Sequence, residues 1–140
     1  MMGAGISMIA AERERQIIIK GWTAEHDDAH TDGSLAMAAS CYARIAGQTA
    51  PASWVGWPWG DGWEPSGDRV RDLVKAGALI AAEIDRLNRA TIRDRTLRLA
   101  QGLRVIRDTT EGYASNVARR ALDEADMADP REDISHRDES

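Results

Sequence analysis

Residues 68–89 read DRVRDLVKAGALIAAEIDRLNR, and this stretch decides the fold class. Apolar side chains recur in it every three or four residues from Val70 to Leu87, which places them on one face of a long α-helix. Gly77 lies on the same face, where a glycine costs about 1 kcal/mol of helix stability relative to alanine. This cost suggests that a second helix crosses closely at Gly77, so we predict that other helices pack against this one.

Helical spacing also appears on both sides of this central stretch, over residues 6–20, 34–46, 90–107 and 110–128. Residues 90–107 either continue the central helix or begin a new helix after a break near Asn88. We therefore predict an all-α fold, a bundle of four or five helices in a single domain over residues 1–129. The core would lie within residues 6–108, with an extra C-terminal helix at residues 110–128 and a disordered tail at residues 130–140.

Residues 47–67 connect the second and third of these helices and read GQTAPASWVGWPWGDGWEPSG. Four of the five tryptophans of the chain lie in this loop, and its glycines and prolines exclude regular structure. A connection of this length is usually either functional or disordered, and indole rings favour burial over exposure to water. We predict an ordered loop whose indoles either fill gaps in the core or stack on a bound ligand.

The overall composition narrows the class of partner. The chain has 140 residues and a formal net charge of −5, and an acidic surface disfavours binding to nucleic acid or to an anionic membrane. The arginines of residues 90–107 are interpreted as a solvated helix face, because acids dilute them. One cysteine, Cys41, leaves no intrachain disulfide, and the N-terminus lacks a signal-peptide pattern, which together favour a cytoplasmic location. Small residues on the predicted helix faces favour close pairing, so we also predict a homodimer.

Residues 21–33 read GWTAEHDDAHTDG and hold the densest set of titratable groups in the chain. They form either a loop or a short helical turn. In a helical turn, Glu25 and Asp28 would share a face, and so would His26 and His30. Closely spaced carboxylates suit Mg²⁺, whereas two imidazoles would suit zinc if a third ligand came from elsewhere. The third interpretation is a solvated acidic turn that caps the neighbouring helices.

Glu83 borders the apolar face of the central helix, where a carboxylate is either paired with a cation or has a shifted pKa. If folding brings Glu83 to the acidic cluster, the predicted metal ligands are Glu25, Asp27, Asp28 and Glu83. The predicted catalytic residues among them are Glu25, Asp28 and Glu83. Mg²⁺ is the predicted ion, with Mn²⁺ as its substitute and zinc as the weaker candidate. The predicted ligand-binding residues are Arg13, Gln16, Trp22, His26, His30, Trp57, Trp59, Trp63 and Lys75.

Four blocks of the sequence carry a resemblance to a known group. They are ERERQI, GWTAEHDDAH followed by GSLAMAASCYA, the WPW loop, and RDLVKAGALIAAEIDRL. In this order they resemble short open reading frames of tailed phages and prophages, and the resemblance ends near Ala90. It implies an accessory protein that acts in the cytoplasm of a bacterial host, and it implies no mechanism.

A weaker resemblance is to all-helical nucleotide pyrophosphohydrolases of the MazG type, which hold Mg²⁺ with Glu and Asp side chains of neighbouring helices. Their pattern is an ExxE followed by an ExxD. This sequence has an ExxD at Glu25 and Asp28 but no ExxE ahead of it, and Glu83 and Asp85 are two positions apart. This resemblance implies a helical fold and a nucleotide as the ligand.

Together these patterns predict a phage accessory protein that binds a nucleotide or a phosphorylated small molecule. In the enzymatic interpretation it is a Mg²⁺-dependent pyrophosphohydrolase. The alternative is a non-enzymatic counter-defence protein, which either sequesters a nucleotide signal or inhibits a host protein through its Trp-rich loop.

Overall fold

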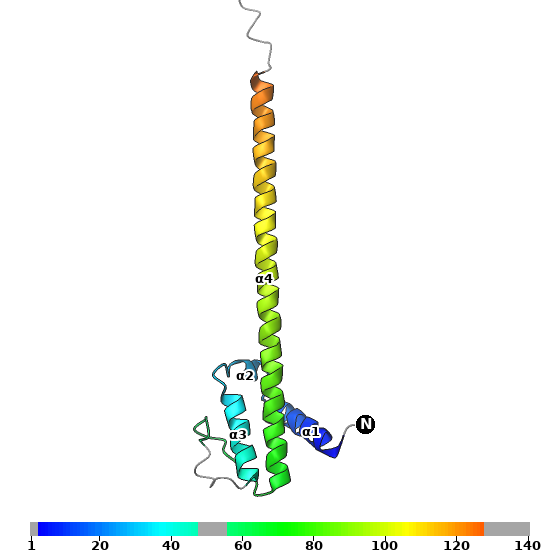
Figure 1. The fold of residues 1–140 in the computed structure, drawn as a ribbon, viewed down its shortest axis with the longest axis vertical. Helices are drawn as coiled ribbons and strands as arrows, with labels where there is room; N and C mark the ends of the chain where they lie inside the picture. Colours follow the sequence, from blue (N-terminus) through cyan, green and yellow to red (C-terminus); the bar gives the residue numbers. More distant parts are fainter. Residues whose placement is uncertain (1–2, 48–55, 128–140) are drawn as a thin grey trace, which may run out of the picture. The chain divides into compact units, whose positions relative to one another are not determined.

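The fold is seen in a computed structural model that describes residues 3–47 and 56–127 (Figure 1). All regular structure in these two ranges is α-helical. The helices are α1 (Ala4–Ile18), α2 (Ala24–Asp28), α3 (Ser34–Ala46) and α4 (Arg69–Met127). The predicted all-α class is therefore confirmed.

Helix α4 differs from the sequence prediction in its length. Residues 110–127, for which the sequence predicts a helix of their own, belong to the same continuous helix as residues 69–107. The physical reason is that residues 69–127 contain no proline, and a single glycine such as Gly102 costs a helix only about 1 kcal/mol. The break considered near Asn88 does not occur. The tail predicted at residues 130–140 lies outside the described residues.

The chain divides into two units, Met1–Ile92 and Arg93–Ser140. The buried apolar core lies entirely in the first unit, between α3 and the N-terminal part of α4 (Figure 1). Its members are Leu35, Ala38, Ala39, Tyr42, Ala76, Leu79 and Ala82. Most of them are alanines, which let the two helices approach closely, while Leu35 and Leu79 fill the remaining volume.

Helix α1 crosses α4 at Gly77, as the sequence predicts. A Cβ atom at Gly77 would lie 2.6 Å from Cδ1 of Ile9, which is closer than two carbon atoms can approach. A salt bridge fixes the same crossing, because Nη1 of Arg71 on α4 lies 2.7 Å from a carboxylate oxygen of Glu12 on α1. Glycine at position 77 therefore lets α1 pack directly on α4, where Glu12 is buried.

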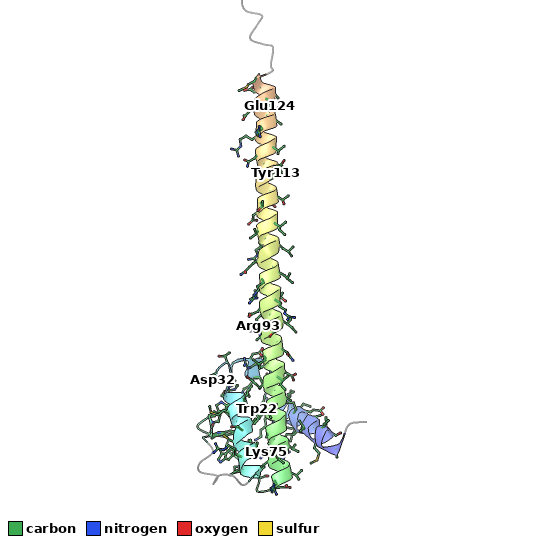
Figure 2. All side chains as sticks on the ribbon, viewed as in Figure 1. Trp22, Asp32, Lys75, Arg93, Tyr113 and Glu124 are labelled. Atoms are coloured by element: carbon green, nitrogen blue, oxygen red, sulfur yellow. The ribbon has the colours of Figure 1, made fainter. Side chains whose placement is uncertain are left out.

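The second unit is described over residues 93–127, which are all helical. Every side chain in this range is exposed except that of Ala100, which is half-buried. Figure 2 shows these side chains projecting from all sides of the helix. None of the described helices combines the length and apolar character that a bilayer-spanning segment needs.

Candidate functional site

A pocket of about 290 Å³ opens in the first unit, and we call it the aromatic pocket. It is lined by Trp22, His26, Asp27, His30, Leu35, Trp57, Trp59, Asp61 and Gly62. Five of these nine residues carry an aromatic ring. The pocket therefore offers flat apolar faces, the surfaces on which a planar ligand stacks.

The rings of the aromatic pocket form a continuous series. Trp22 and His26 stack with their planes 8° apart and their centroids 6.2 Å apart, and His26 and His30 follow with a centroid separation of 5.1 Å. His30 then contacts Trp59 at 5.1 Å, and Trp59 meets Trp57 edge-on at 5.0 Å. The spacing of four residues from Trp22 to His26 to His30 brings the first three rings to one side of α2. Residues close together in the sequence thus supply three of the rings, and Trp57 and Trp59 supply the other two.

Hydrogen bonds at the ends of α2 and α3 hold the two imidazoles in place. The hydroxyl of Thr23 accepts a hydrogen bond from the backbone N–H of His26 at 3.3 Å and so caps α2. Nδ1 of His30 lies 3.1 Å from the hydroxyl of Ser34 in the first turn of α3. Asp32 accepts a hydrogen bond from the backbone N–H of Ser34. Hydrogen bonding from the side chain of Ser34, and then from its backbone N–H, lowers the pKa of the Asp32 carboxyl group. The capping interpretation of the acidic cluster is correct for Asp32.

Asp27 lines the aromatic pocket and is buried, with only 1% of its surface exposed. Its carboxylate forms an ion pair with Arg13 of α1. Arg13 also donates to the backbone oxygen of Trp22 at 3.4 Å, so one guanidinium fixes both ends of the turn between α1 and α2. Gly21, with φ of +72°, allows that turn. Asp27 thus acts as an anchor for α2 whose charge is already balanced.

A second, smaller cavity of about 50 Å³ adjoins the aromatic pocket, and we call it the polar cleft. Both cavities are lined by Trp22 and Gly62, so the indole of Trp22 stands between them. The other residues lining the polar cleft are Glu12, Arg15, Gln16, Lys20, Tyr42, Glu64, Lys75 and Leu79. The polar cleft contains three cationic side chains, whereas no Lys or Arg is among the described residues that line the aromatic pocket.

Glu12 holds one of the three cations of the polar cleft, Arg15. Its carboxylate is 3% exposed and accepts hydrogen bonds from Nε and Nη2 of Arg15, both at 2.9 Å, in addition to the salt bridge with Arg71. Burial alone would raise the pKa of Glu12, but the hydrogen bonds from Arg15 and Arg71 outweigh burial and lower it to about 2. Glu12 is therefore ionised at neutral pH and holds Arg15 at the mouth of the cleft.

Lys75 and Lys20 complete the positive side of the polar cleft. The ammonium of Lys75 donates to the backbone oxygen of Glu64 at 2.6 Å and lies 5.1 Å from the ring centre of Tyr42. Burial lowers the pKa of Lys75. The ammonium of Lys20 lies 3.8 Å from the carboxylate of Glu64, and both of these side chains are largely exposed. Figure 2 shows Lys75 and Trp22 among the packed helices of the first unit.

Two buried polar atoms at these cavities lack a hydrogen-bond partner among the described residues. They are the indole N–H of Trp59, which lines the aromatic pocket, and the side-chain oxygen of Gln16, which lines the polar cleft. Buried polar atoms are usually satisfied in folded proteins. Both atoms are shielded from solvent, although their residues line the two cavities.

The four predicted metal ligands do not form one group. Among the described residues, no set of three or more His, Cys, Asp or Glu side chains is arranged to hold a metal ion. Asp27 pairs with Arg13, and Asp28 pairs with Arg89 at 2.8 Å. The arginines come from other helices, so the local spacing of the acids gives no sign of them.

The carboxylates of Glu25 and Glu83 are likewise engaged in hydrogen bonds within the protein. Glu25 is exposed at the first turn of α2, and hydrogen bonds from its own backbone and from Thr23 lower the pKa of its carboxyl group. Glu83 accepts two hydrogen bonds from Arg86, both at 2.8 Å, and these lower its pKa. Glu83 is thus both paired and shifted in pKa, and its partner is Arg86 of the same helix. Glu25, Asp28 and Glu83 do not gather into the predicted catalytic group.

The predicted ligand-binding residues are distributed over both cavities. Trp22, His26, His30, Trp57 and Trp59 line the aromatic pocket, while Gln16 and Lys75 line the polar cleft. Arg13 and Trp63 line neither of these two cavities, but they contact residues that do. Arg13 holds the buried Asp27, and Trp63 packs on Tyr42 and Trp57 at 4.9 and 5.0 Å.

Sequence reasoning missed Arg15, Lys20 and Glu64 as residues of the polar cleft. Arg15 follows Glu12 by three residues, which signals only a local ion pair. Lys20 and Glu64 are distant in the sequence and have no pattern in common. Only the tertiary fold shows that they face one cavity.

Comparisons with protein-family models, with curated proteins and with solved structures found no match to this chain.

Proposed function

We propose that the first unit binds a nucleotide or another phosphorylated small molecule with a planar ring. The observation that carries this proposal is the adjacency of two unlike cavities, an aromatic pocket and a polar cleft with three cations, which share Trp22 and Gly62. The ring would stack in the aromatic pocket, and the phosphate would lie over the cleft.

The aromatic pocket suits a single base. Its volume of about 290 Å³ lies just below the roughly 300–1,000 Å³ range of small-molecule pockets. Stacking on an aromatic side chain contributes about 1–3 kcal/mol per base and tolerates any base.

The polar cleft suits a phosphate at its rim. Lys20 and Glu64 form an exposed ion pair at 3.8 Å. Exposed pairs of this kind contribute at most about 1 kcal/mol. A phosphate can therefore replace Glu64 as the partner of Lys20 at little cost. The cleft is too small to enclose a phosphate, so the contact would be made at its surface by Lys20 and Arg15.

We propose binding without turnover. Hydrolysis of a pyrophosphate with Mg²⁺ requires carboxylates that are free to hold the ion. Asp27, Asp28 and Glu83 are instead engaged by Arg13, Arg89 and Arg86. In a phage accessory protein, binding without turnover would serve to sequester a nucleotide signal of the host.

The Trp-rich loop gives less support to a host-protein interface. Trp57, Trp59 and Trp63 are half-buried and pack against the core of the first unit. The indole N–H of Trp57 also donates to the backbone oxygen of Asp61 at 2.6 Å. These rings are held by the protein itself, so we place the ligand beside them.

Calorimetric titration of the full chain with nucleoside 5′-mono-, di- and triphosphates, in buffer with EDTA, tests this proposal. We expect binding without metal, and Lys20→Ala should weaken the binding of the phosphorylated ligands by about 3- to 10-fold. Arg104→Ala, an exposed charge removal in the second unit, is the matched control and should bind as the wild type does.

Two results would reject the proposal. One is the absence of heat for every nucleotide at millimolar concentration. The other is equal binding of the free nucleoside and the nucleotide, which would remove the role of the polar cleft. Release of pyrophosphate after Mg²⁺ is added would refute the statement that no turnover occurs.

A further inference from the structure

The second unit carries an apolar seam that the described residues leave uncovered. Its side chains recur at alternating intervals of four and three residues, which is the heptad spacing of coiled coils. The seam consists of Leu99, Leu103, Ile106, Thr110, Tyr113 and Val117. The five apolar members are between 49% and 72% exposed.

A helix of this kind needs a partner to be stable. Most helical stability in proteins comes from packing an apolar face against another element, because isolated helices are marginal in water. The other exposed aliphatic residues of the unit, such as Leu97 and Val105, fall outside the heptad positions of the seam and do not continue it. The helix therefore has one face to cover, and two such faces can cover each other.

The distribution of charge identifies the partner and its direction. Residues 93–107 contain five arginines and one aspartate, whereas residues 108–127 contain five acids and two arginines. Two parallel copies would place basic half against basic half. Two antiparallel copies would place each basic half against an acidic half, which is the favourable arrangement.

We infer that this seam pairs with the same seam of a second copy of the chain, in antiparallel direction about a two-fold axis near Asp108. In this register Leu99 faces Val117 of the second copy, Leu103 faces its Tyr113, and Ile106 faces its Thr110. All six seam positions are then matched, and the interface is self-complementary, as a two-fold axis requires.

Residues beside the seam fit this register. Arg95 would face Asp123 of the second copy at each end of the interface. Ala100 would face Ala114 of the second copy, and these small side chains let the helices approach closely. Near the axis, Arg107 would face Arg107 of the second copy. Its charge is neutralised by Asp108 of the same chain, whose carboxylate accepts two hydrogen bonds from it at 2.8 and 3.0 Å.

The area of this interface is sufficient for a stable dimer. Each aliphatic side chain of the seam can bury roughly 60–120 Å², and the tyrosine about 150–250 Å². Over two copies the seam and the flanking alanines remove on the order of 1,200 Å² from water. Stable interfaces begin at about this size.

Sedimentation equilibrium of the full chain tests the pairing. The wild type should be a dimer, and the double variant Leu103→Glu/Ile106→Glu should associate at least about 100-fold more weakly, because its carboxylates would have to be buried in the seam. Val105→Glu, on the same helix but off the seam, is the matched control and should remain a dimer. Urea unfolding followed by tryptophan fluorescence verifies that each variant keeps the fold of the first unit, where all the tryptophans lie.

Disulfide trapping tests the direction. Leu99→Cys and Val117→Cys chains are mixed and oxidised, and Cys41 does not interfere because it is buried. Eighteen residues separate the two positions, about 27 Å along a helix, so parallel chains cannot join them. Mixed Leu99→Cys/Val117→Cys dimers support the proposal. The proposal is overturned if the wild type is monomeric at about 100 μM, or if the Val105→Glu control associates as weakly as the double variant. It is also overturned if disulfides form only between chains that carry the same substitution.

Discussion

Replacing Glu12 with glutamine should measure how much the ion pairs of the Glu12 carboxylate stabilise the first unit. Glu12 is 3% exposed, and its carboxylate pairs with Arg15 on the same helix and with Arg71 on α4, so the second pair joins α1 to α4. Glutamine preserves its size and removes its charge. The two guanidinium groups would then lose their anion at the helix crossing.

The magnitude follows from the pKa of Glu12, which falls from the ordinary value of 4.5 to about 2 in the folded protein. Because the folded pKa is the lower one, the ionised carboxylate stabilises the fold above pH 4.5, and this contribution is lost as the pH falls through about 2. At 1.36 kcal/mol for each pKa unit, the contribution is about 3 kcal/mol at pH 7 and about half of that at pH 3. Breaking a buried ion pair costs about 3–5 kcal/mol, and the lower end applies because Arg15 and Arg71 are partly exposed.

The assay is urea unfolding of the full chain, followed by tryptophan fluorescence at pH 7 and pH 3. All five tryptophans lie in the first unit, so their signal reports its unfolding. Glu14→Gln is the matched control, because Glu14 is on the same helix and exposed. We expect Glu12→Gln to lower the unfolding free energy by about 3 kcal/mol relative to this control at pH 7, with the gap halved at pH 3. Equal stability of the two variants, or a gap that does not change with pH, would refute this reasoning.

Two further substitutions test the packing of the first unit. Gly77→Ala should lower the unfolding free energy by about 1–3 kcal/mol despite the better helix propensity of alanine, because the new Cβ would lie 2.6 Å from Ile9; Gly112→Ala, where a Cβ meets open space, should instead raise the thermal stability of α4 measured by circular dichroism. Arg13→Met should cost about 3–5 kcal/mol in urea unfolding, because it leaves the carboxylate of Asp27 buried without its cation. If the double variant Arg13→Met/Asp27→Asn is no more stable than Arg13→Met alone, the cost does not arise from that unpaired charge.

The parts of the fold that depend on neighbouring residues could be predicted from the sequence. Apolar spacing indicates the helices, and the cost of Gly77 inside one of them indicates a close helix crossing, which the structure places at Ile9. The length of α4 could be predicted less well, because the sequence near Asn88 does not decide between one continuous helix and two. Helical spacing on both sides of that point is compatible with one helix or with two.

The parts of the site that depend on partners distant in the sequence could not be predicted. The acidic cluster has the composition of a metal site, but Asp27 is neutralised by Arg13, fourteen residues away, and Asp28 by Arg89, sixty-one residues away. The ring series was easier to anticipate, because Trp22, His26 and His30 share one spacing. Composition indicates which groups could react, whereas the fold decides which of them are already paired.

The most direct test of ligand binding in the aromatic pocket is NMR of the histidine side chains of the full chain during titration with ATP, GTP, CTP and UTP. The chain has three histidines; His26 and His30 line the pocket, and His136, outside the described residues, serves as the internal reference. We expect at least one nucleotide to shift the imidazole signals of His26 and His30 through the ring current of its base, while the signal of His136 stays in place. Signals of His26 and His30 that do not move at saturating nucleotide, or that move together with that of His136, would contradict the proposed site.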